Sequence, residues 1–286
     1  MSRDLLISSL VQGSPFLKVI TPSSIQDVSS SVHAIQGRRD YMEDTNIIHE
    51  LEGISVYGVF DGHGGGEISK FLKDEFWNFL TAEFKSISCL DHSNEVKNAI
   101  HTTFLKIDRH LSTIRAIGQN HDPGSTAVIA LKIKNKLYLG NLGDSRAIIF
   151  DSCGNLLAST KDHKPLDEQL RIEKAGGVVA WGRVNGNLAV SRAFGDFAHK
   201  IKDNRYMGVN SIVSPVPDVF GIDLLITGPI ILVLASDGLW DVMSPDGVIS
   251  RFKTLNLKLL AQTLVEEAYS KGSGDNITAL VVKLLP

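Results

Sequence analysis

Cysteine, excess positive charge and long apolar runs are scarce or missing in this sequence of 286 residues. The two cysteines, Cys89 and Cys153, are too few for a disulfide framework and lack the paired spacing of a zinc site. With 29 basic and 32 acidic residues, the chain has no surplus of positive charge for nucleic acid or an anionic membrane. No apolar run approaches the roughly 18 residues of a transmembrane helix. We therefore expect a protein of the cytoplasm, also able to enter the nucleus, that binds neither nucleic acid nor membrane.

The N-terminal residues 1–31 lack the signals that direct or anchor a protein. Their apolar stretch, 5–11, is interrupted by serines and follows two charged residues, unlike a secretory signal. Ser2, in place of glycine, leaves N-myristoylation without support. We expect an extension over 1–31, followed by one monomeric domain over 32–286.

Short apolar runs and amphipathic segments occur in blocks along the rest of the chain. The apolar runs predict strands at 32–35, 54–60, 127–133, 136–139, 147–150, 230–234 and 277–285. Apolar residues at three- and four-residue spacing predict helices at 67–84, 94–117, 166–174 and 257–269. This grouping favours an α+β layered domain over a doubly wound parallel sheet. Segment 197–211 is polar and aperiodic, and we expect a mobile surface loop there.

An acidic residue next to glycine follows three of the predicted strands. These residues are Asp61, Asp144 and Asp237, and a fourth, Asp275, precedes the last strand. If the strands are antiparallel neighbours, the four carboxylates meet at one edge. Clustered carboxylates take up protons unless cations lie among them, and oxygen ligands suit magnesium or manganese better than zinc. Each aspartate alone is more often a turn residue, so the prediction of a two-cation site depends on all of them together.

Seven segments complete this pattern. They are Arg39-x-x-Met42-Glu43-Asp44, Phe60-Asp61-Gly62-His63-Gly64-Gly65, Gly124-Ser125-Thr126-Ala127, Gly143-Asp144-Ser145-Arg146, Leu188-Ala-Val-Ser-Arg192-Ala-Phe-Gly-Asp196, Asp237-Gly238-Leu239-Trp240-Asp241 and Gly274-Asp275-Asn276. In identity and order they resemble the motifs of the metal-dependent protein phosphatases of the PP2C type. The resemblance runs from about Val32 to the C-terminus.

The resemblance implies both a fold and a reaction. The fold is a four-layer α-β-β-α sandwich of two antiparallel sheets flanked by helix pairs, with metals at one edge. The reaction is hydrolysis of phosphoserine and phosphothreonine in proteins by a hydroxide that bridges two Mn2+ or Mg2+ ions. It implies that Asp61 bridges the ions, with Glu43 and the carbonyl of Gly62 on one, and Asp237 and Asp275 on the other. It also implies that Asp44 supports metal-bound water, and that Asp144 and Asp241 hold a weaker third ion with Asp237.

The resemblance implies roles for two further side chains at the site. Arg39 is expected to clamp the phosphate, because guanidinium pairs bidentately with phosphate oxygens, and Arg38 is the lesser candidate. His63 is expected to protonate the leaving alkoxide, a role that suits a group titrating near neutrality. The alternative for His63 is a structural hydrogen bond in a turn.

The resemblance also extends to residues around the site. Arg192 and Asp196 are read as structural supports, and Ser125 and Thr126 as strand-end packing. The segment after Asp196 matches the family's flap, a loop beside the active site. Its Lys200, Lys202 and Arg205 could attract acidic or phosphorylated partners or form a solvated loop.

Other readings of the same residues meet specific objections. The glycine-rich segment 61–67 lacks the Gly-Lys-Ser/Thr ending and the glycine spacing of nucleotide-binding loops. Neither Cys89 nor Cys153 is followed six residues later by arginine, so a cysteine-based phosphatase has no support. A pseudophosphatase acting as a regulatory binding module would be expected to lack some of the ligands, which are all present here. A hydrolase of small phosphoesters would share the site and stays open.

Overall fold

A computed structural model describes residues 29–51, 53–87, 89–114, 121–224, 228–253 and 257–284. Two five-stranded antiparallel sheets form its centre. The first contains, in spatial order, β15 (Asp218–Asp223), β7 (Lys136–Leu142), β6 (Ala127–Ile133), β3 (Ile54–Phe60) and β2 (Thr45–Leu51). The second contains β1 (Ser29–Ile35), β17 (Ile277–Leu284), β16 (Ile230–Ala235), β8 (Arg146–Asp151) and β9 (Leu156–Ser159).

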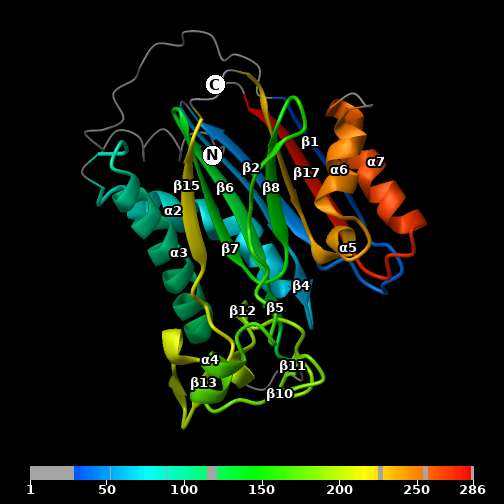
Figure 1. Cartoon of the computed structure of the whole chain (residues 1–286). Helices are drawn as coiled ribbons and strands as arrows, with labels where there is room; N and C mark the ends of the chain where they lie inside the picture. Colours follow the sequence, from blue (N-terminus) through cyan, green and yellow to red (C-terminus); the bar gives the residue numbers. More distant parts are fainter. Residues whose placement is uncertain are drawn as a thin grey trace, which may run out of the picture.

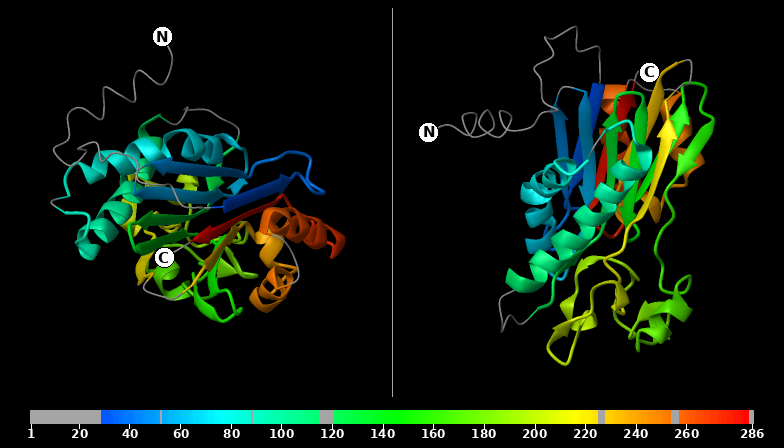
Figure 2. Two further views of the ribbon diagram at one scale, coloured as in Figure 1. Left: turned by 90° about the horizontal axis from the view of Figure 1, so that it is seen from above. Right: turned by 90° about the vertical axis from the view of Figure 1, so that its left-hand side faces the viewer.

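Helices cover the outer face of each sheet (Figures 1 and 2). The first sheet carries α2 (Glu67–Phe84) and α3 (Ser93–Ile114). The second carries α5 (Asp237–Trp240), α6 (Pro245–Phe252) and α7 (Leu257–Ser270). The predicted four-layer α-β-β-α sandwich of two antiparallel sheets is therefore confirmed. Among the described helices, none has the length and apolar character needed to cross a membrane.

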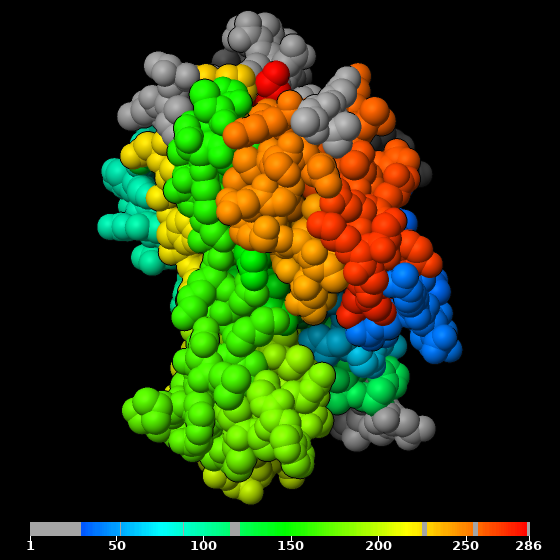
Figure 3. Space-filling view, turned by 45° about the vertical axis from the view of Figure 1, so that its right-hand side comes forward, coloured from blue at the N-terminus to red at the C-terminus, as the bar shows by residue number. Residues whose placement is uncertain are grey.

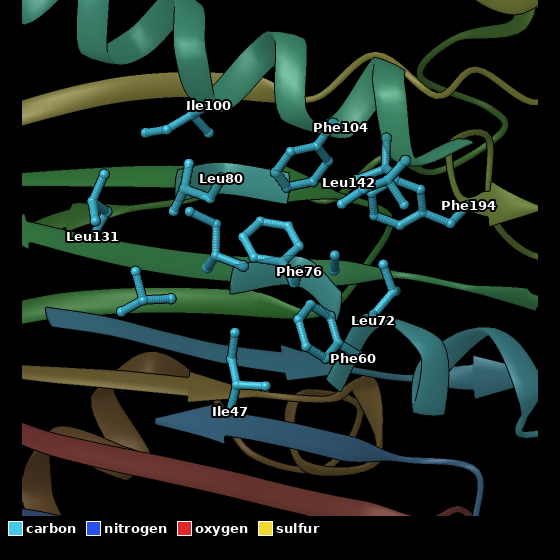
Figure 4. Close-up of a cluster of buried hydrophobic side chains, with 14 of the residues drawn as sticks. Ile47, Phe60, Leu72, Phe76, Leu80, Ile100, Phe104, Leu131, Leu142 and Phe194 are labelled. Carbon is cyan, nitrogen blue, oxygen red and sulfur yellow. The ribbon is translucent and has the colours of Figure 1, made fainter. Parts of the chain in front are cut away.

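The apolar spacing of α2 explains how it packs. Ile68, Leu72, Phe76 and Leu80 recur every fourth residue, so they lie on one face and are buried against α3 and the first sheet. Figure 4 shows Leu72, Phe76 and Leu80 above the strands, with Phe104 of α3 beside them. A separate cluster fills the space between the sheets and includes Ile230, Leu232 and Leu234 of β16, while the alternate residues of β16 are buried under the helices of the second sheet. Because both faces of β16 are covered, its sequence is a continuous apolar run.

Short elements build a lobe at one end of the sandwich, which we call the flap lobe and define as residues 165–214. Figure 3 shows this lobe protruding below the body of the molecule. It contains α4 (Gln169–Lys174), β10 (Val179–Ala180), β11 (Arg183–Val184), β12 (Phe194–Gly195), η1 (Phe197–His199), β13 (Ile201–Lys202), β14 (Arg205–Tyr206) and η2 (Gly208–Asn210). A small sheet, in the order β12, β5 (Gly124–Ser125) and β4 (Gly62–His63), connects the lobe to the sandwich.

Some predicted strands and helices agree with the structure, and others were missed or have different boundaries. The predicted strands at 54–60 and 127–133 are confirmed, but β2, β9 and β15 were not predicted. The predicted helix at 166–174 is a turn until residue 168, and the end of the predicted helix at 94–117 lies outside the described residues. The N-terminal extension over 1–31 also falls outside them, except for residues 29–31, which belong to β1.

The prediction of a mobile surface loop at 197–211 was right about the surface position of most of the segment but wrong about its lack of structure. This segment forms η1, the antiparallel pair β13 and β14, and η2. Lys200, expected on the surface, is fully buried, and its Nζ lies 2.7 Å from the equally buried Oδ1 of Asp108 in α3. The Tyr206 hydroxyl donates to Asp108 Oδ2 at 2.6 Å. The segment is therefore bound to the sandwich by a buried ion pair, and Lys200 cannot attract partners.

Candidate metal centre

Strand order brings the predicted acidic residues to one end of the sandwich. Asp237 directly follows Ser236 at the end of β16, and Asp275 lies two residues before β17. These two strands are antiparallel, with Ala235 opposite Ala279, so the end of one lies beside the start of the other. Asp61 follows β3, which belongs to the facing sheet. Both sheets therefore contribute carboxylates to the same end.

Glu43 and Asp44 arrive there because they precede β2, which the sequence reading missed. Thr45, the first residue of β2, pairs with Phe60, so Asp44 and Asp61 are neighbours across two antiparallel strands. The side chain of Asn276 fixes this loop. It accepts a hydrogen bond from Glu43 N at 2.8 Å and donates to the carbonyls of Gln36 at 2.7 Å and Tyr41 at 2.9 Å.

Gly62 lies in a space that admits no side chain. A Cβ at this position would lie 2.6 Å from the carbonyl oxygen of Glu43 and 2.9 Å from Ser69 Oγ. Any other residue would therefore push the loop that carries Glu43 away from Asp61. The close approach of these two backbones requires glycine.

The gathered carboxylates line a cavity of about 590 Å³ between the sandwich and the flap lobe. Its walls include nearly all of the residues predicted for the site, except that Glu43 and Asp44 lie behind the lining. The cavity lining consists of Arg39, Asp61, Gly62, His63, Gly64, Asp122, Thr126, Asp144, Lys164, Arg183, Asn187, Leu188, Ala189, Val190, Asp196, Ala198, His199, Asp237, Asp241 and Asp275.

Mutual repulsion and burial perturb these carboxyl groups strongly. Burial, reinforced by the charges of Asp44, Asp237, Asp144 and Asp275, raises the pKa of Asp61 well above its ordinary value. Burial together with neighbouring carboxylates raises the pKa of Asp237 to about 7. Burial, partly offset by hydrogen bonding, raises the pKa of Asp44 to about 6. The arrangement therefore concentrates more negative charge than the protein alone can neutralise.

The donor set fits divalent cations that prefer oxygen. Asp44 is buried, and while its Oδ2 accepts from Ser236 Oγ at 2.8 Å, its Oδ1 has no hydrogen-bond partner. Within the described ranges, however, no three His, Cys, Asp or Glu side chains are already arranged around one point as metal ligands. Two protein cations pair with the carboxylates instead. Arg39 Nη2 lies 2.5 Å from Asp275 Oδ2, and Lys164 Nζ lies 2.6 Å from Asp144 Oδ2.

The residues predicted for a third ion lie in the same cavity. Asp144 is 3% exposed, whereas Asp241 is exposed on the wall next to Asp237. Burial raises the pKa of Asp241, and Lys164 partly counters this effect. The ammonium group of Lys164 therefore lies where an additional cation would have to compete with it. The sequence reading did not identify Lys164, which no glycine or strand end marks.

His63 occupies β4, between Asp61 and the flap lobe, and its side chain is 28% exposed. Its Nε2 lies 2.9 Å from both carboxylate oxygens of Asp196, which is 3% exposed. Burial opposes a charge on the ring, but the carboxylate of Asp196 outweighs this effect and raises the pKa of His63. The structural reading of Asp196 therefore omitted its contact with His63.

The remaining predicted residues make hydrogen bonds or ion pairs that define their surroundings. Arg38 donates to the carbonyl of Ser273, and its guanidinium lies 4.5 Å from the ring centre of Tyr269, which ties it to a structural role. Arg39 is half-exposed on the cavity wall. Arg192 binds Glu168 and Asp218, a supporting role as expected. Thr126 Oγ1 lies 2.7 Å from Ser145 Oγ, in agreement with strand-end hydrogen bonding.

The family model and the relatives compared below are all phosphatases. The family model described as "Protein phosphatase 2C" matches residues 28–277. "Protein phosphatase 1B" of Bos taurus is 38% identical over 269 residues, which cover 87% of this chain and 55% of the bovine protein. "Probable protein phosphatase 2C 59" of Arabidopsis thaliana is 38% identical over 260 residues, covering 86% and 76% of the two chains. A solved phosphatase of Toxoplasma gondii has a TM-score of 0.73 at 27% identity, covering 89% of this chain and 92% of its own.

Proposed function

Because this chain belongs to the protein phosphatase 2C family, a family of metal-dependent protein serine/threonine phosphatases, we propose that it hydrolyses phosphoserine and phosphothreonine in proteins. The observation that carries the proposal is the burial of Asp61 among four other carboxylates. Such a cluster costs free energy unless cations neutralise it. The cavity beside it has a positively charged guanidinium and an imidazole on its wall, as a phosphate ester requires.

The ions that suit this site are Mn2+ or Mg2+, two per site, because the available ligands are carboxylate and carbonyl oxygens. Asp61 is central, with Glu43 and the Gly62 carbonyl on one side and Asp237 and Asp275 on the other. Two bound ions would lower the pKa of bound water, which would make hydroxide available at neutral pH, and would neutralise charge on the phosphoryl group.

The protein's own residues then act on the ester. Arg39 is placed to bind two phosphate oxygens with its guanidinium, releasing Asp275 as it does so. His63 is placed to give a proton to the oxygen of the departing serine or threonine, which leaves poorly as an alkoxide. Asp44 supports the water around the ions through its unpaired Oδ1. The flap lobe forms the opposite wall of the cavity, which includes Arg183 and His199.

Turnover of a phosphothreonine peptide and of p-nitrophenyl phosphate, with and without millimolar Mn2+, tests the proposal. We expect activity that depends on the metal and that chelator abolishes. Asp61→Asn should reduce activity by about 10³-fold or more, since it removes the central ligand of the metal site. Binding of Mn2+ measured by calorimetry should weaken in the same variant while its circular dichroism spectrum stays that of the wild type, which separates loss of metal from loss of fold.

Two alternatives predict different results. A pseudophosphatase that serves as a binding module would remain inactive with every substrate and metal concentration while staying folded. A hydrolase of small phosphoesters would turn over p-nitrophenyl phosphate but leave folded phosphoproteins and peptides intact. The presence of Glu43, Asp61, Asp237 and Asp275 together argues against the first alternative.

A further inference from the structure

We propose that Asp196 is a positioning residue for the reaction, and that it holds the imidazole of His63 in one orientation and one tautomer. This inference rests on the proposed function for its catalytic consequence, but the positioning itself can be measured without turnover. In this role the carboxylate of Asp196 orients the ring of His63, whereas a residue that only supports the flap lobe would act through its backbone.

The contact between the side chains of His63 and Asp196 is symmetric and largely buried. His63 Nε2 lies 2.9 Å from Oδ1 and 2.9 Å from Oδ2 of Asp196. The Asp196 side chain is 5% exposed, and His63 is its only side-chain partner in the part of the chain that the structure describes. A buried carboxylate with a single partner has no other group to stabilise, so its effect falls on the imidazole ring.

The backbone is shaped to deliver this carboxylate. Asp196 follows β12, which pairs with β5, and β5 in turn pairs with β4, which carries His63. Its backbone lies in the left-handed region at φ 50°, which is unfavourable for a residue with a side chain. The amide of Asp196 donates to the Pro123 carbonyl at 3.1 Å. Three short strands and a strained residue thus bring together side chains that are 133 positions apart.

Gly124 leaves room for this contact. A Cβ on Gly124 would lie 2.3 Å from His63 Nε2 and 2.3 Å from Asp196 Oδ2. A side chain on the strand between the two residues would separate them. The absence of one allows a direct hydrogen bond across the middle strand of the small sheet.

The contact determines which nitrogen of His63 reacts. Because Asp196 accepts from Nε2–H, Nδ1 is the nitrogen left for the leaving group, and it makes no hydrogen bond within the described residues. As hydroxide adds to phosphorus, the P–O bond to the serine or threonine breaks and the Nδ1 proton moves to the departing oxygen, which leaves the ring neutral with its proton on Nε2. The hydrogen bond to Asp196 keeps that proton on Nε2 throughout, so the ring needs no rearrangement, and Nδ1 takes up a proton from solvent before the next turnover.

Substrates with different leaving groups test the catalytic consequence. We expect Asp196→Ala to lower kcat about 10- to 100-fold for a phosphothreonine peptide and for phenyl phosphate. p-Nitrophenyl phosphate, whose leaving group hardly needs a proton, should change by less than about 3-fold. In a His63→Gln background, Asp196→Ala should have no further effect on this dependence, because both changes remove the same function.

Asp122→Asn is the matched control. Asp122 anchors the same segment by accepting from the amides of Phe197 at 2.9 Å and Ala198 at 2.7 Å, but it makes no hydrogen bond to His63. It should therefore leave the dependence on the leaving group unchanged. An equal loss for all substrates in Asp196→Ala, or losses that multiply in the double variant, would overturn the proposal and leave Asp196 with a structural role.

The ring nitrogens of His63 provide a readout that needs no activity. In 15N-labelled protein without metal, two-bond nitrogen–proton correlation spectra distinguish the tautomers of the neutral ring. We expect the Nε2–H form in the wild type and in Asp196→Asn, whose amide oxygen still accepts, and a mixture in Asp196→Ala. An unchanged tautomer in Asp196→Ala would contradict positioning even if the protein proved to have no phosphatase activity, so the two proposals fail separately.

Discussion

Replacing Lys200 by methionine tests whether the flap lobe is held by its buried ion pair. The change removes the ammonium but keeps most of the volume of the side chain. It leaves Asp108 Oδ1 with the Gly195 amide, at 2.9 Å, as its remaining donor, and it leaves the Ala193 carbonyl without its bond to Nζ. Removing one partner of a buried pair costs about 3–5 kcal/mol, because the other charge stays buried.

The structure favours the lower end of that range for Lys200→Met. The Tyr206 hydroxyl continues to donate to Asp108 Oδ2 at 2.6 Å, so the carboxylate keeps two hydrogen bonds. We therefore expect a loss of about 3 kcal/mol. With an m-value of about 3 kcal/mol/M, the midpoint of urea unfolding should fall by about 1 M.

Urea unfolding of the metal-free protein, followed by tryptophan fluorescence and circular dichroism, measures this loss. Lys202→Met is the control, because Lys202 is exposed two residues away and should change stability by less than about 0.5 kcal/mol. Adding Asp108→Asn to Lys200→Met should recover part of the loss by removing the uncompensated charge. A loss below about 1 kcal/mol in Lys200→Met, or the same loss in both lysine variants, would refute the reasoning.

Three further experiments test the metal centre and the contact between His63 and Asp196. Metal-free protein should lose stability as pH rises from about 4 to about 7, because the folded-state pKa values of Asp44 and Asp237 are raised, so the folded chain retains protons that the unfolded chain has released. The two shifts together correspond to a loss of about 7 kcal/mol in thermal unfolding, which saturating Mn2+ should prevent. Asp237→Asn should reduce this loss in metal-free protein to the part that Asp44 causes, while weakening Mn2+ binding at least 10-fold by calorimetry; unchanged Mn2+ affinity would remove Asp237 from the site. Gly124→Ala should lower kcat for phosphothreonine peptide more than for p-nitrophenyl phosphate, by separating His63 from Asp196; equal kcat ratios would show that the strand accommodates a methyl group.

The sequence was sufficient where local pattern and burial agree. The segments 54–60 and 127–133 are apolar except for Ser55 and Lys132 near their ends, because most of each strand is buried in the sandwich, and their boundaries were predicted correctly. Strand β2 was missed because it is an edge strand that carries polar residues, such as Asn46 and His49. Its absence from the prediction hid the reason that Asp44 lies beside Asp61.

Contacts between distant positions could not be read from the sequence. Lys200 and Asp108 are 92 positions apart, and nothing in a polar segment distinguishes a lysine that is buried with a partner from one in solvent. Asp196 likewise has no local signal that it faces His63. The resemblance to a family supplied the candidate ligands, while the assignment of partners to His63, Asp144 and Arg38 required the structure.

The position of β17 has a consequence for how the protein is made. β17 lies between β1 and β16, so Ile277 pairs with Ile35 from the first strand described, and Asp275 stands just before it. A nascent chain that has left the ribosome only as far as α5 already contains Glu43, Asp61 and Asp237, but it lacks the middle of its second sheet and Asp275 of the metal centre. Closing so long a loop is a slow step. The carboxylate cluster around Asp61 is therefore completed only after synthesis has passed β17.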